Sequence, residues 1–207
     1  MLDKDLILIG YSGHAFVIAE VAIENGISIM GYSDKEAAIL NPFKLEYLGF
    51  EKDQDFIGWK KDCSFILGIG DNYLRQSIAK IIVNKNKKIK TVIHSSASIS
   101  VNSVIGSGAF INRNVSVNAL AVIGENVILN TGCIVEHECV LEDAVHIAPG
   151  AVLAGNVYIG ERSFVGANAV IKQGVVIGKD VIIGAGSVVI KDVQDGKKIV
   201  GNPSREI

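Results

Sequence analysis

The strongest constraint on the fold of this chain is a six-residue period that fills its second half. From Ile93 to Val189 an aliphatic residue occupies every sixth position without a break. A flat strand followed by a tight corner has this period, and three such sides close one coil of a prism. The second half is therefore predicted to be a stack of parallel strands wound into coils. The aliphatic positions are Ile93, Ile99, Ile105, Ile111, Val117, Ile123, Leu129, Val135, Leu141, Ile147, Leu153, Ile159, Val165, Ile171, Ile177, Ile183 and Val189.

Two other positions of the repeat support this interpretation. A small or β-branched residue follows each aliphatic residue by four positions, and glycine often follows it directly, as at Gly106 and Gly160. Small residues suit a tight corner, and coils stack at about 4.8 Å, the hydrogen-bonding distance between strands. Cys133 and Cys139 both occupy the small, inward position, so we interpret them as packing residues rather than as redox groups or nucleophiles.

The first half predicts a small α/β domain. Strands and helices alternate there, which is typical of a Rossmann-like parallel sheet that binds ligands at the carboxyl ends of its strands. Residues 36–61 are predicted to hold a loop and one short helix. We assign residues 1–90 to this domain and residues 91–207 to the repeat domain. The predicted elements are strands at Leu6–Ile9, up to Asp34, up to Asp71 and near Ile89–Ile93, with helices at His14–Asn25 and Tyr73–Val83.

A glycine turn after the first strand is a candidate phosphate site. It reads Gly10-Tyr11-Ser12-Gly13-His14, and its backbone N–H groups and the following helix start suit a phosphate or diphosphate. The turn is not a GxGxxG motif, so a dinucleotide is not indicated, and a tight turn without a ligand is the alternative. Ser12, Asp34 and Gly70 are expected at the same sheet edge, which favours a ligand.

Composition excludes several classes of function. A formal net charge of −2 gives no electrostatic basis for binding nucleic acid or an anionic membrane. Three cysteines without a framework spacing suit a reducing compartment. The apolar run near the N-terminus is too short for a signal segment or a membrane span. These features predict a soluble cytoplasmic protein with no membrane insertion.

The segment around His137 holds the candidate metal-binding or catalytic residues of the second half. A zinc site needs three or four converging ligands, and the chain has only four histidines, His14, His94, His137 and His146, so no metal is predicted. Judged from the residues alone, two interpretations remain. His137 and Glu138 are either inert polar residues at a solvent-exposed corner or catalytic residues. The register favours catalysis, because one coil of eighteen residues places Gly155 beside His137. A bare glycine leaves room for a reacting carbonyl and offers an N–H group.

Four motifs carry a resemblance that spans essentially the whole chain. They are GYSGH, GIGDNYLR, ILNTGCIVEHECVLEDAVHIAPGAVLAGNVYIG and VGNPSREI. With them the chain resembles the sialic-acid O-acetyltransferase family of hexapeptide-repeat acyltransferases. That family includes the N-acetyltransferases of UDP-4-amino-4,6-dideoxy sugars on the route to bacillosamine. The resemblance implies a left-handed parallel β-helix, acetyl-CoA as co-substrate, and a homotrimer with active sites between neighbouring prisms.

The resemblance also implies roles for particular residues. His137 matches the general base, and Glu138 matches the acidic residue that raises its basicity. His146 matches a residue that contacts acetyl-CoA, and the amide of Gly155 matches the group near the thioester carbonyl. The remaining matches are Ala167 and Ala185 in the CoA groove, with Ser12, Gly13, His14, Asp34 and Gly70 at the nucleotide-sugar. Lys35 replaces a second acidic residue that the bacillosamine enzymes can carry, which affects the choice of nucleotide or sugar.

Together these features predict a sugar N-acetyltransferase that serves glycan biosynthesis. Imidazole is the side chain whose pKa ordinarily lies near neutrality, so it suits removal of a proton from a sugar ammonium. No nucleophilic Ser or Cys is required, and direct transfer through a ternary complex is expected. One alternative is O-acetylation of sialic acid or a related sugar. Another is a non-catalytic trimeric assembly subunit, which the intact His137, Glu138 and Gly155 disfavour.

Overall fold

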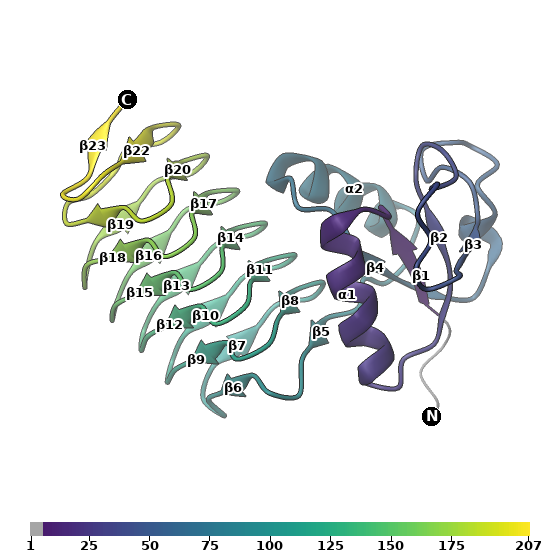
Figure 1. Ribbon diagram of the computed structural model, residues 1–207, viewed down its shortest axis with the longest axis horizontal. Coiled ribbons are helices and arrows are strands. Elements are labelled where there is room, and N and C mark those ends of the chain that lie inside the picture. Colours follow the sequence, from purple (N-terminus) through teal and green to yellow (C-terminus); the bar gives the residue numbers. More distant parts are fainter. Residues whose placement is uncertain (1–5) are drawn as a thin grey trace. The chain divides into compact units, whose positions relative to one another are not determined.

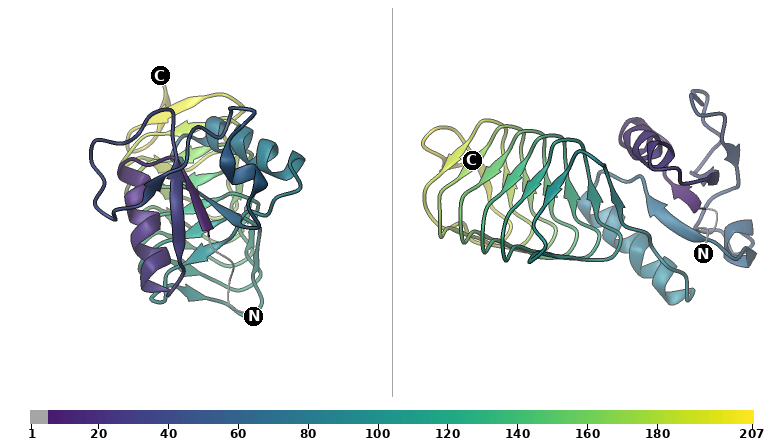
Figure 2. Two further views of the ribbon diagram at one scale, coloured as in Figure 1. Left: turned by 90° about the vertical axis from the view of Figure 1, so that its right-hand side faces the viewer. Right: turned by 90° about the horizontal axis from the view of Figure 1, so that it is seen from below.

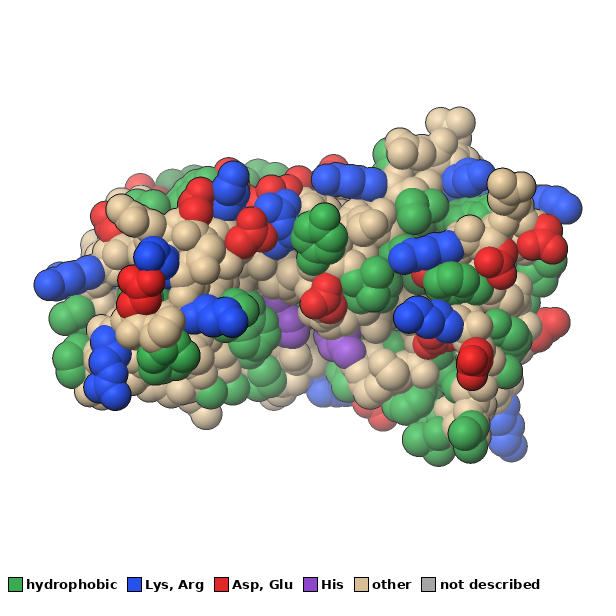
Figure 3. All heavy atoms as spheres, turned by 90° about the horizontal axis from the view of Figure 1, so that it is seen from above, with side chains coloured by type: hydrophobic (Ala, Val, Ile, Leu, Met, Phe, Trp, Pro, Cys, Tyr) green, Lys and Arg blue, Asp and Glu red, His purple; other side chains and the backbone are tan. Residues whose placement is uncertain are grey.

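The computed structural model describes residues 6–207, and it divides into two compact units (Figure 1). The first unit ends at Val92, and the second runs from Ile93 to Ile207. No helix within residues 6–207 has the length and apolarity that a membrane crossing requires. On the face shown in Figure 3, lysines and arginines are interspersed with acidic residues. That face therefore carries no large patch of a single sign.

The first unit is a parallel sheet with a helix after its first strand and another after its last. The sheet order is β3-β2-β1-β4, and every pair in it is parallel. The carboxyl ends of β1, β2 and β4 therefore meet at one edge, as expected from the sequence. The elements are β1 (Leu6–Ile9), α1 (Gly13–Glu24), β2 (Ile29–Ser33), β3 (Glu46–Tyr47), the 3₁₀-helix η1 (Ile57–Lys60), β4 (Ser64–Leu67) and α2 (Asn72–Asn84).

The core of this unit follows from the apolar pattern of its elements. All four residues of β1 are buried, as in a strand covered on both faces. In α2 the residues Ile78 and Ile82 lie on one face of the helix and join Phe65 of β4 in a single hydrophobic cluster. This packing holds the start of α2 beside the sheet edge where ligands bind in such folds.

The structure differs from the sequence expectations at three places in or next to this unit. The predicted strand near Ile89–Ile93 is reduced to an isolated bridge at Ile89 and the two-residue strand β5 (Val92–Ile93). The predicted strand up to Asp71 ends at Leu67. The next residue, Gly68, packs so closely on α1 that a Cβ there would lie 2.5 Å from the Cβ of Ala15. The region 36–61 contains, besides its one short helix, the strand β3, which was not predicted. With two exposed residues, β3 has no apolar alternation that a sequence reading could detect.

The second unit is a left-handed parallel β-helix, as predicted (Figures 1 and 2). Each strand from β6 to β18 pairs in parallel with the strand eighteen residues later, as Val122 does with Val140, whereas the last strands β22 and β23 pair antiparallel. Three sheets form the sides, in the orders β19-β16-β13-β10-β7, β23-β22-β20-β17-β14-β11-β8-β5 and β21-β18-β15-β12-β9-β6. The strands are β5 (Val92–Ile93), β6 (Ser98–Ile99), β7 (Val104–Ile105), β8 (Phe110–Ile111), β9 (Ser116–Val117), β10 (Val122–Ile123), β11 (Ile128–Leu129), β12 (Ile134–Val135), β13 (Val140–Leu141), β14 (His146–Ile147), β15 (Val152–Leu153), β16 (Tyr158–Ile159), β17 (Phe164–Val165), β18 (Val170–Ile171), β19 (Val176–Ile177), β20 (Ile182–Ile183), β21 (Val188–Val189), β22 (Lys198–Val200) and β23 (Arg205–Glu206).

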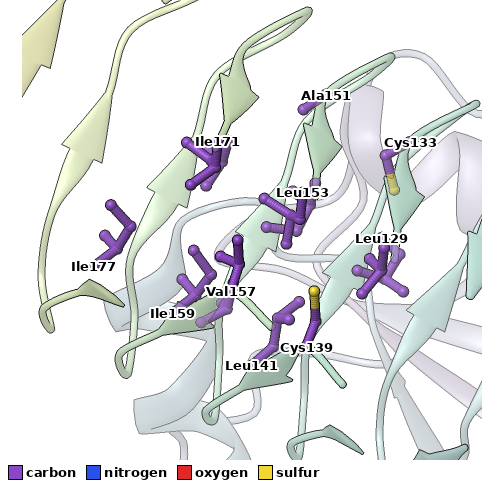
Figure 4. Packing of buried hydrophobic residues seen from close by; sticks show 14 of the residues in the cluster. Leu129, Cys133, Cys139, Leu141, Ala151, Leu153, Val157, Ile159, Ile171 and Ile177 are labelled. Carbon is purple, nitrogen blue, oxygen red and sulfur yellow. The ribbon is translucent and has the colours of Figure 1, made fainter. Parts of the chain in front are cut away.

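The six-residue period lines the interior of this prism. The second residue of each strand points inward, and from Ile111 onward these aliphatic residues belong to one buried cluster. Figure 4 shows Leu129, Leu141 and Leu153 among them, with Cys133 and Cys139 beside them. The first residue of each strand points outward, because successive side chains of a strand alternate.

The corners of the prism recur with the same period. A residue in the left-handed backbone region occupies every sixth position from 108 to 186, one before each small inward residue. Many of these residues are Gly or Asn, which adopt this conformation most easily. The glycines that directly follow an aliphatic residue serve close packing instead: a Cβ on Gly160 would lie 2.6 Å from the backbone of Gly178 in the next coil.

We predict that the cysteines of the prism do not react in the native protein. Cys133 and Cys139 are fully buried, and burial raises the pKa of the Cys133 thiol to about 12. The thiolate is the reactive form, so labelling by a thiol reagent at pH 8 should require unfolding. Mass spectrometry after brief labelling, with and without denaturant, checks this. Rapid native labelling of either residue would contradict an inward position.

Candidate active site

His137 stands at an exposed corner of the prism. It lies between β12 and β13, where the six-stranded side turns into the five-stranded side. Half of its side chain is exposed, and its Nδ1 lies 3.0 Å from Oε2 of Glu138. Glu138 has a φ of 61°, so it is the left-handed residue of this corner. Because a carboxylate accepts the Nδ1 proton, Nε2 is the acceptor nitrogen of the neutral ring.

Gly155 lies directly beside the imidazole, as the eighteen-residue register predicts. The N–H of Asn156 donates to the carbonyl oxygen of His137 at 2.8 Å, which fixes the two coils against each other. A Cβ on Gly155 would meet Cε1 and Nε2 of the His137 ring. Within residues 6–207 no acceptor is recorded for the Gly155 N–H. An imidazole and an available N–H donor therefore adjoin at this corner.

At another corner of the prism, the N–H groups at the position equivalent to Gly155 donate hydrogen bonds to side chains. There the N–H of Glu125 donates to Asp143 Oδ1 at 2.7 Å, and the N–H of Lys179 donates to Asp195 Oδ1 at 3.0 Å. The comparison shows that carboxylates can cover this position of the repeat. The residue one coil after Gly155 is Gln173, and within residues 6–207 the Gly155 N–H makes no such hydrogen bond, which leaves it to a ligand.

The other predicted CoA contacts lie elsewhere on the same chain. His146 begins β14 and points outward, since Ile147 fills the core; its ring packs edge-on against Phe164, with 5.1 Å between ring centroids. Ala167 and Ala185 follow β17 and β20 and stack at one corner, which is not the corner of His137. One chain thus gathers His137, Glu138 and Gly155, and it separates them from Ala167 and Ala185.

At the sheet edge of the first unit, Asp34 fixes the glycine turn. Its Oδ2 accepts from the N–H of Tyr11 at 2.9 Å, and its Oδ1 accepts from its neighbour Lys35 at 2.7 Å. Gly10 has a φ of 82°, which a side chain rarely adopts. Ser12 is the exposed N-cap residue of α1, and its side chain makes no capping hydrogen bond, so it lies at the edge with Gly13.

His14 and Gly70 face each other across this edge. A Cβ on Gly70 would lie 3.9 Å from the Cβ of His14, which brings the turns after β1 and β4 together. Burial and, to a smaller extent, the charge of Arg75 lower the pKa of His14 to about 4. The imidazole is therefore neutral at physiological pH and can serve as one donor and one acceptor.

Sequence reasoning missed two buried charged residues near this edge. Arg75 is 1% exposed, and Glu51, 5% exposed, accepts from the hydroxyl of Ser33 at 2.7 Å. Helical spacing could have revealed Arg75, because it lies in phase with Ile78 and Ile82 on the buried face of α2. No sequence signal marks Glu51.

In the part of the chain that the structure describes, no group of three or more His, Cys, Asp or Glu side chains could hold a metal ion.

Comparison with known proteins agrees with both units. Residues 5–82 match the PglD N-terminal domain, and residues 120–155 and 156–191 match the bacterial transferase hexapeptide model. A variant of perosamine N-acetyltransferase from Caulobacter crescentus, solved with CoA and GDP-perosamine, is 31% identical over 98% of this chain and 96% of its own, with a TM-score of 0.91. No curated protein gives a significant match.

Two further solved structures are similar over nearly their full length. The acetyltransferase domain of PglB from Neisseria gonorrhoeae, solved with acetyl coenzyme A, is 30% identical over 99% of this chain and 100% of its own, with a TM-score of 0.91. WeeI from Acinetobacter baumannii is 24% identical over 98% of this chain and 99% of its own, with a TM-score of 0.88, and shares the fold.

The hexapeptide match and the similarity to CoA-bound acetyltransferases define an acyl-transfer enzyme of the β-helix class. The chain belongs to the hexapeptide-repeat acyltransferase family, and it is an acetyl-CoA-dependent enzyme.

Proposed function

We propose that the protein transfers the acetyl group of acetyl-CoA to the amino group of a nucleotide-linked amino-deoxy sugar. The observation that carries this proposal is the adjacency of the His137 imidazole, the Glu138 carboxylate and the Gly155 N–H at one exposed corner. Support comes from the solved relatives, which bind CoA, acetyl-CoA and an amino sugar linked to GDP. Since acetyl-CoA is a cytoplasmic metabolite, we place the reaction in the cytoplasm.

The proposed mechanism is direct transfer with His137 as general base. Nε2 of His137 takes a proton from the sugar ammonium, and the free amine attacks the thioester carbonyl. Glu138 holds the Nδ1 proton, which fixes the tautomer and stabilises the imidazolium that forms. The Gly155 N–H stabilises the oxyanion of the tetrahedral intermediate. The carbon–sulfur bond then breaks, the attacking nitrogen gives up one proton, which balances protonation of the CoA thiolate, and the nitrogen keeps the acetyl group as an amide.

The groups outside this corner are assigned to binding. We assign His146, Ala167 and Ala185 to the CoA molecule. Since Ala167 and Ala185 lie at a different corner from His137, a complete site needs two prisms, with the groove of one beside the histidine of its neighbour. The first unit holds the nucleotide-sugar with Ser12, Gly13, His14, Asp34, Lys35 and Gly70.

UDP is the nucleotide that we propose first, and GDP is the second candidate. The motifs that resemble the UDP-4-amino-4,6-dideoxy sugar enzymes favour UDP. The complex of perosamine N-acetyltransferase with GDP-perosamine favours GDP, because that enzyme is 31% identical to this chain. Lys35 directly follows Asp34 at the end of β2, and the resemblance makes this position relevant to the choice of nucleotide or sugar.

Thiol release from acetyl-CoA tests the proposed function. The enzyme is mixed with acetyl-CoA and, in separate reactions, a UDP-linked 4-amino sugar, a GDP-linked 4-amino sugar, free sialic acid and CMP-linked sialic acid. Free CoA should appear only with a nucleotide-linked amino sugar. Release with the sialic acids instead would establish O-acetylation, and no release with any acceptor would establish a non-catalytic assembly subunit.

We predict a homotrimer in solution. The outward residues Val104, Val122, Val140 and Val176 form an exposed apolar row on the five-stranded side that adjoins the His137 corner. A single chain leaves this row in contact with water, and a neighbouring prism would cover it. Light scattering should give three times 22.0 kDa, about 66 kDa. A mass of one chain would contradict the shared site.

A further inference from the structure

A buried arginine lies beneath the loop that follows β4. Arg75, on the first turns of α2, is 1% exposed. Its Nη1 donates to the carbonyl oxygens of Ile69 at 3.1 Å and Gly70 at 3.0 Å, and its Nη2 donates to Asn72 Oδ1 at 2.9 Å. One guanidinium therefore sets the orientation of two successive peptide groups.

The opposite sides of these two peptides are hydrogen-bond donors. In a trans peptide the N–H points away from the C=O, so the N–H groups of Gly70 and Asp71 point away from Arg75. Within residues 6–207 no acceptor is recorded for either of them. Two successive N–H groups that face the same way make a concavity suited to an anion.

These donors lie at the sheet edge assigned to the nucleotide-sugar. The N–H of Gly68 donates to the carbonyl oxygen of Ile9 at 2.7 Å, which ties this loop to the end of β1. Gly70 faces His14, as described above. The strand order reverses between β1 and β4, and ligands of open α/β sheets bind at such a reversal.

We propose that Arg75 is a positioning residue of the nucleotide-sugar site. It holds the carbonyls of Ile69 and Gly70 inward, and so directs the N–H groups of Gly70 and Asp71 to the diphosphate. This assignment rests on the proposed function. Arginine suits the task because its planar fork can bridge several acceptors at once, whereas one ammonium group cannot keep the same geometry.

The charges around the loop are consistent with an anion. Burial lowers the pKa of Arg75 to about 9, so the guanidinium remains protonated at neutral pH. The Asp71 carboxylate offsets part of this charge, but its Oδ1 accepts from the N–H of Leu74 at 2.7 Å and caps α2. His14 is neutral, as described above, and adds no charge of its own.

Inhibition by nucleotides of decreasing charge tests the proposal. The inhibition constants of UDP, UMP and uridine against the nucleotide-sugar are measured for the parent and for Arg75→Met, with GDP, GMP and guanosine as a second series. We expect Arg75→Met to weaken the diphosphate by about tenfold or more and the nucleoside by less than about threefold. The KM of acetyl-CoA should not change.

Matched variants separate positioning from loss of the fold. Lys80→Met removes an exposed positive charge from the same helix and should leave all constants unchanged. Arg75→Lys keeps the charge without the fork and should weaken the diphosphate as Arg75→Met does, with parental circular dichroism. Parental inhibition by Arg75→Lys, or equal weakening of diphosphate and nucleoside, would overturn the role of Arg75. Failure of both diphosphates to inhibit the parent would overturn the proposed function as well.

Discussion

Replacement of His137 by alanine should lower kcat by about 10²–10⁴-fold, the usual range for loss of a general base. The side chain is half exposed and makes no contribution to the prism core, so the variant should fold and melt as the parent does. Its affinity for acetyl-CoA should change little, because the residues assigned to CoA lie on other parts of the prism. Steady-state kinetics and calorimetry with acetyl-CoA measure both quantities.

Two further variants sharpen this result. His94→Ala removes a partly exposed histidine that lies more than two coils earlier, and its kcat should stay within about twofold of the parent. Glu138→Gln keeps an oxygen that can accept the Nδ1 proton but removes the negative charge, so its loss should be smaller than that of His137→Ala. If His137→Ala remained within a few-fold of the parent, His137 would not be the base.

Replacement of Gly155 by alanine is expected to lower kcat by about 10²–10³-fold, the range for loss of one oxyanion donor. The added Cβ would meet the His137 ring, so the imidazole must move away from the N–H. No left-handed backbone is required at this glycine, and His137 and Gln173 occupy the same place one coil earlier and one coil later. The backbone therefore accepts a side chain there, and the loss should come from the displaced ring.

Gln173→Ala is the matched control for Gly155→Ala. It places alanine at the same corner position, one coil away from Gly155, and should leave kcat within about twofold of the parent. Melting temperatures of both variants check the fold. A Gly155→Ala enzyme with parental kcat and a parental melting temperature would show that neither the ring position nor this N–H matters for catalysis.

The sequence predicted the prism well because its environment repeats. Each aliphatic residue from Ile93 to Val189 meets the same interior as the residue eighteen positions away, so one pattern determines the strands and the inward side chains. The same register predicted that Gly155 lies beside His137. In the first unit no such repetition exists. The boundaries of β1 were predicted, whereas β3 was not, because two exposed residues carry no periodic signal.

Features that depend on contacts between distant segments could not be predicted. Asp34 accepts hydrogen bonds from the N–H groups of Tyr11 and Lys35, and Tyr11 lies 23 positions away in the sequence. The buried hydrogen bond of Ser33 to Glu51, which lies 18 positions away, has the same origin. These contacts arise when the sheet brings its strand ends together, and no local pattern in the sequence records them.

The most direct test of the central claim is analysis of the reaction product. The parent and His137→Ala are incubated with acetyl-CoA and a UDP-linked or GDP-linked 4-amino sugar, and the sugar product is identified by mass spectrometry and NMR. We predict that the parent adds one acetyl group to the sugar nitrogen as an amide, and that His137→Ala binds acetyl-CoA but forms this product at least about 10²-fold more slowly. Acetylation on an oxygen, or amide formation by His137→Ala at the parental rate, would contradict the account.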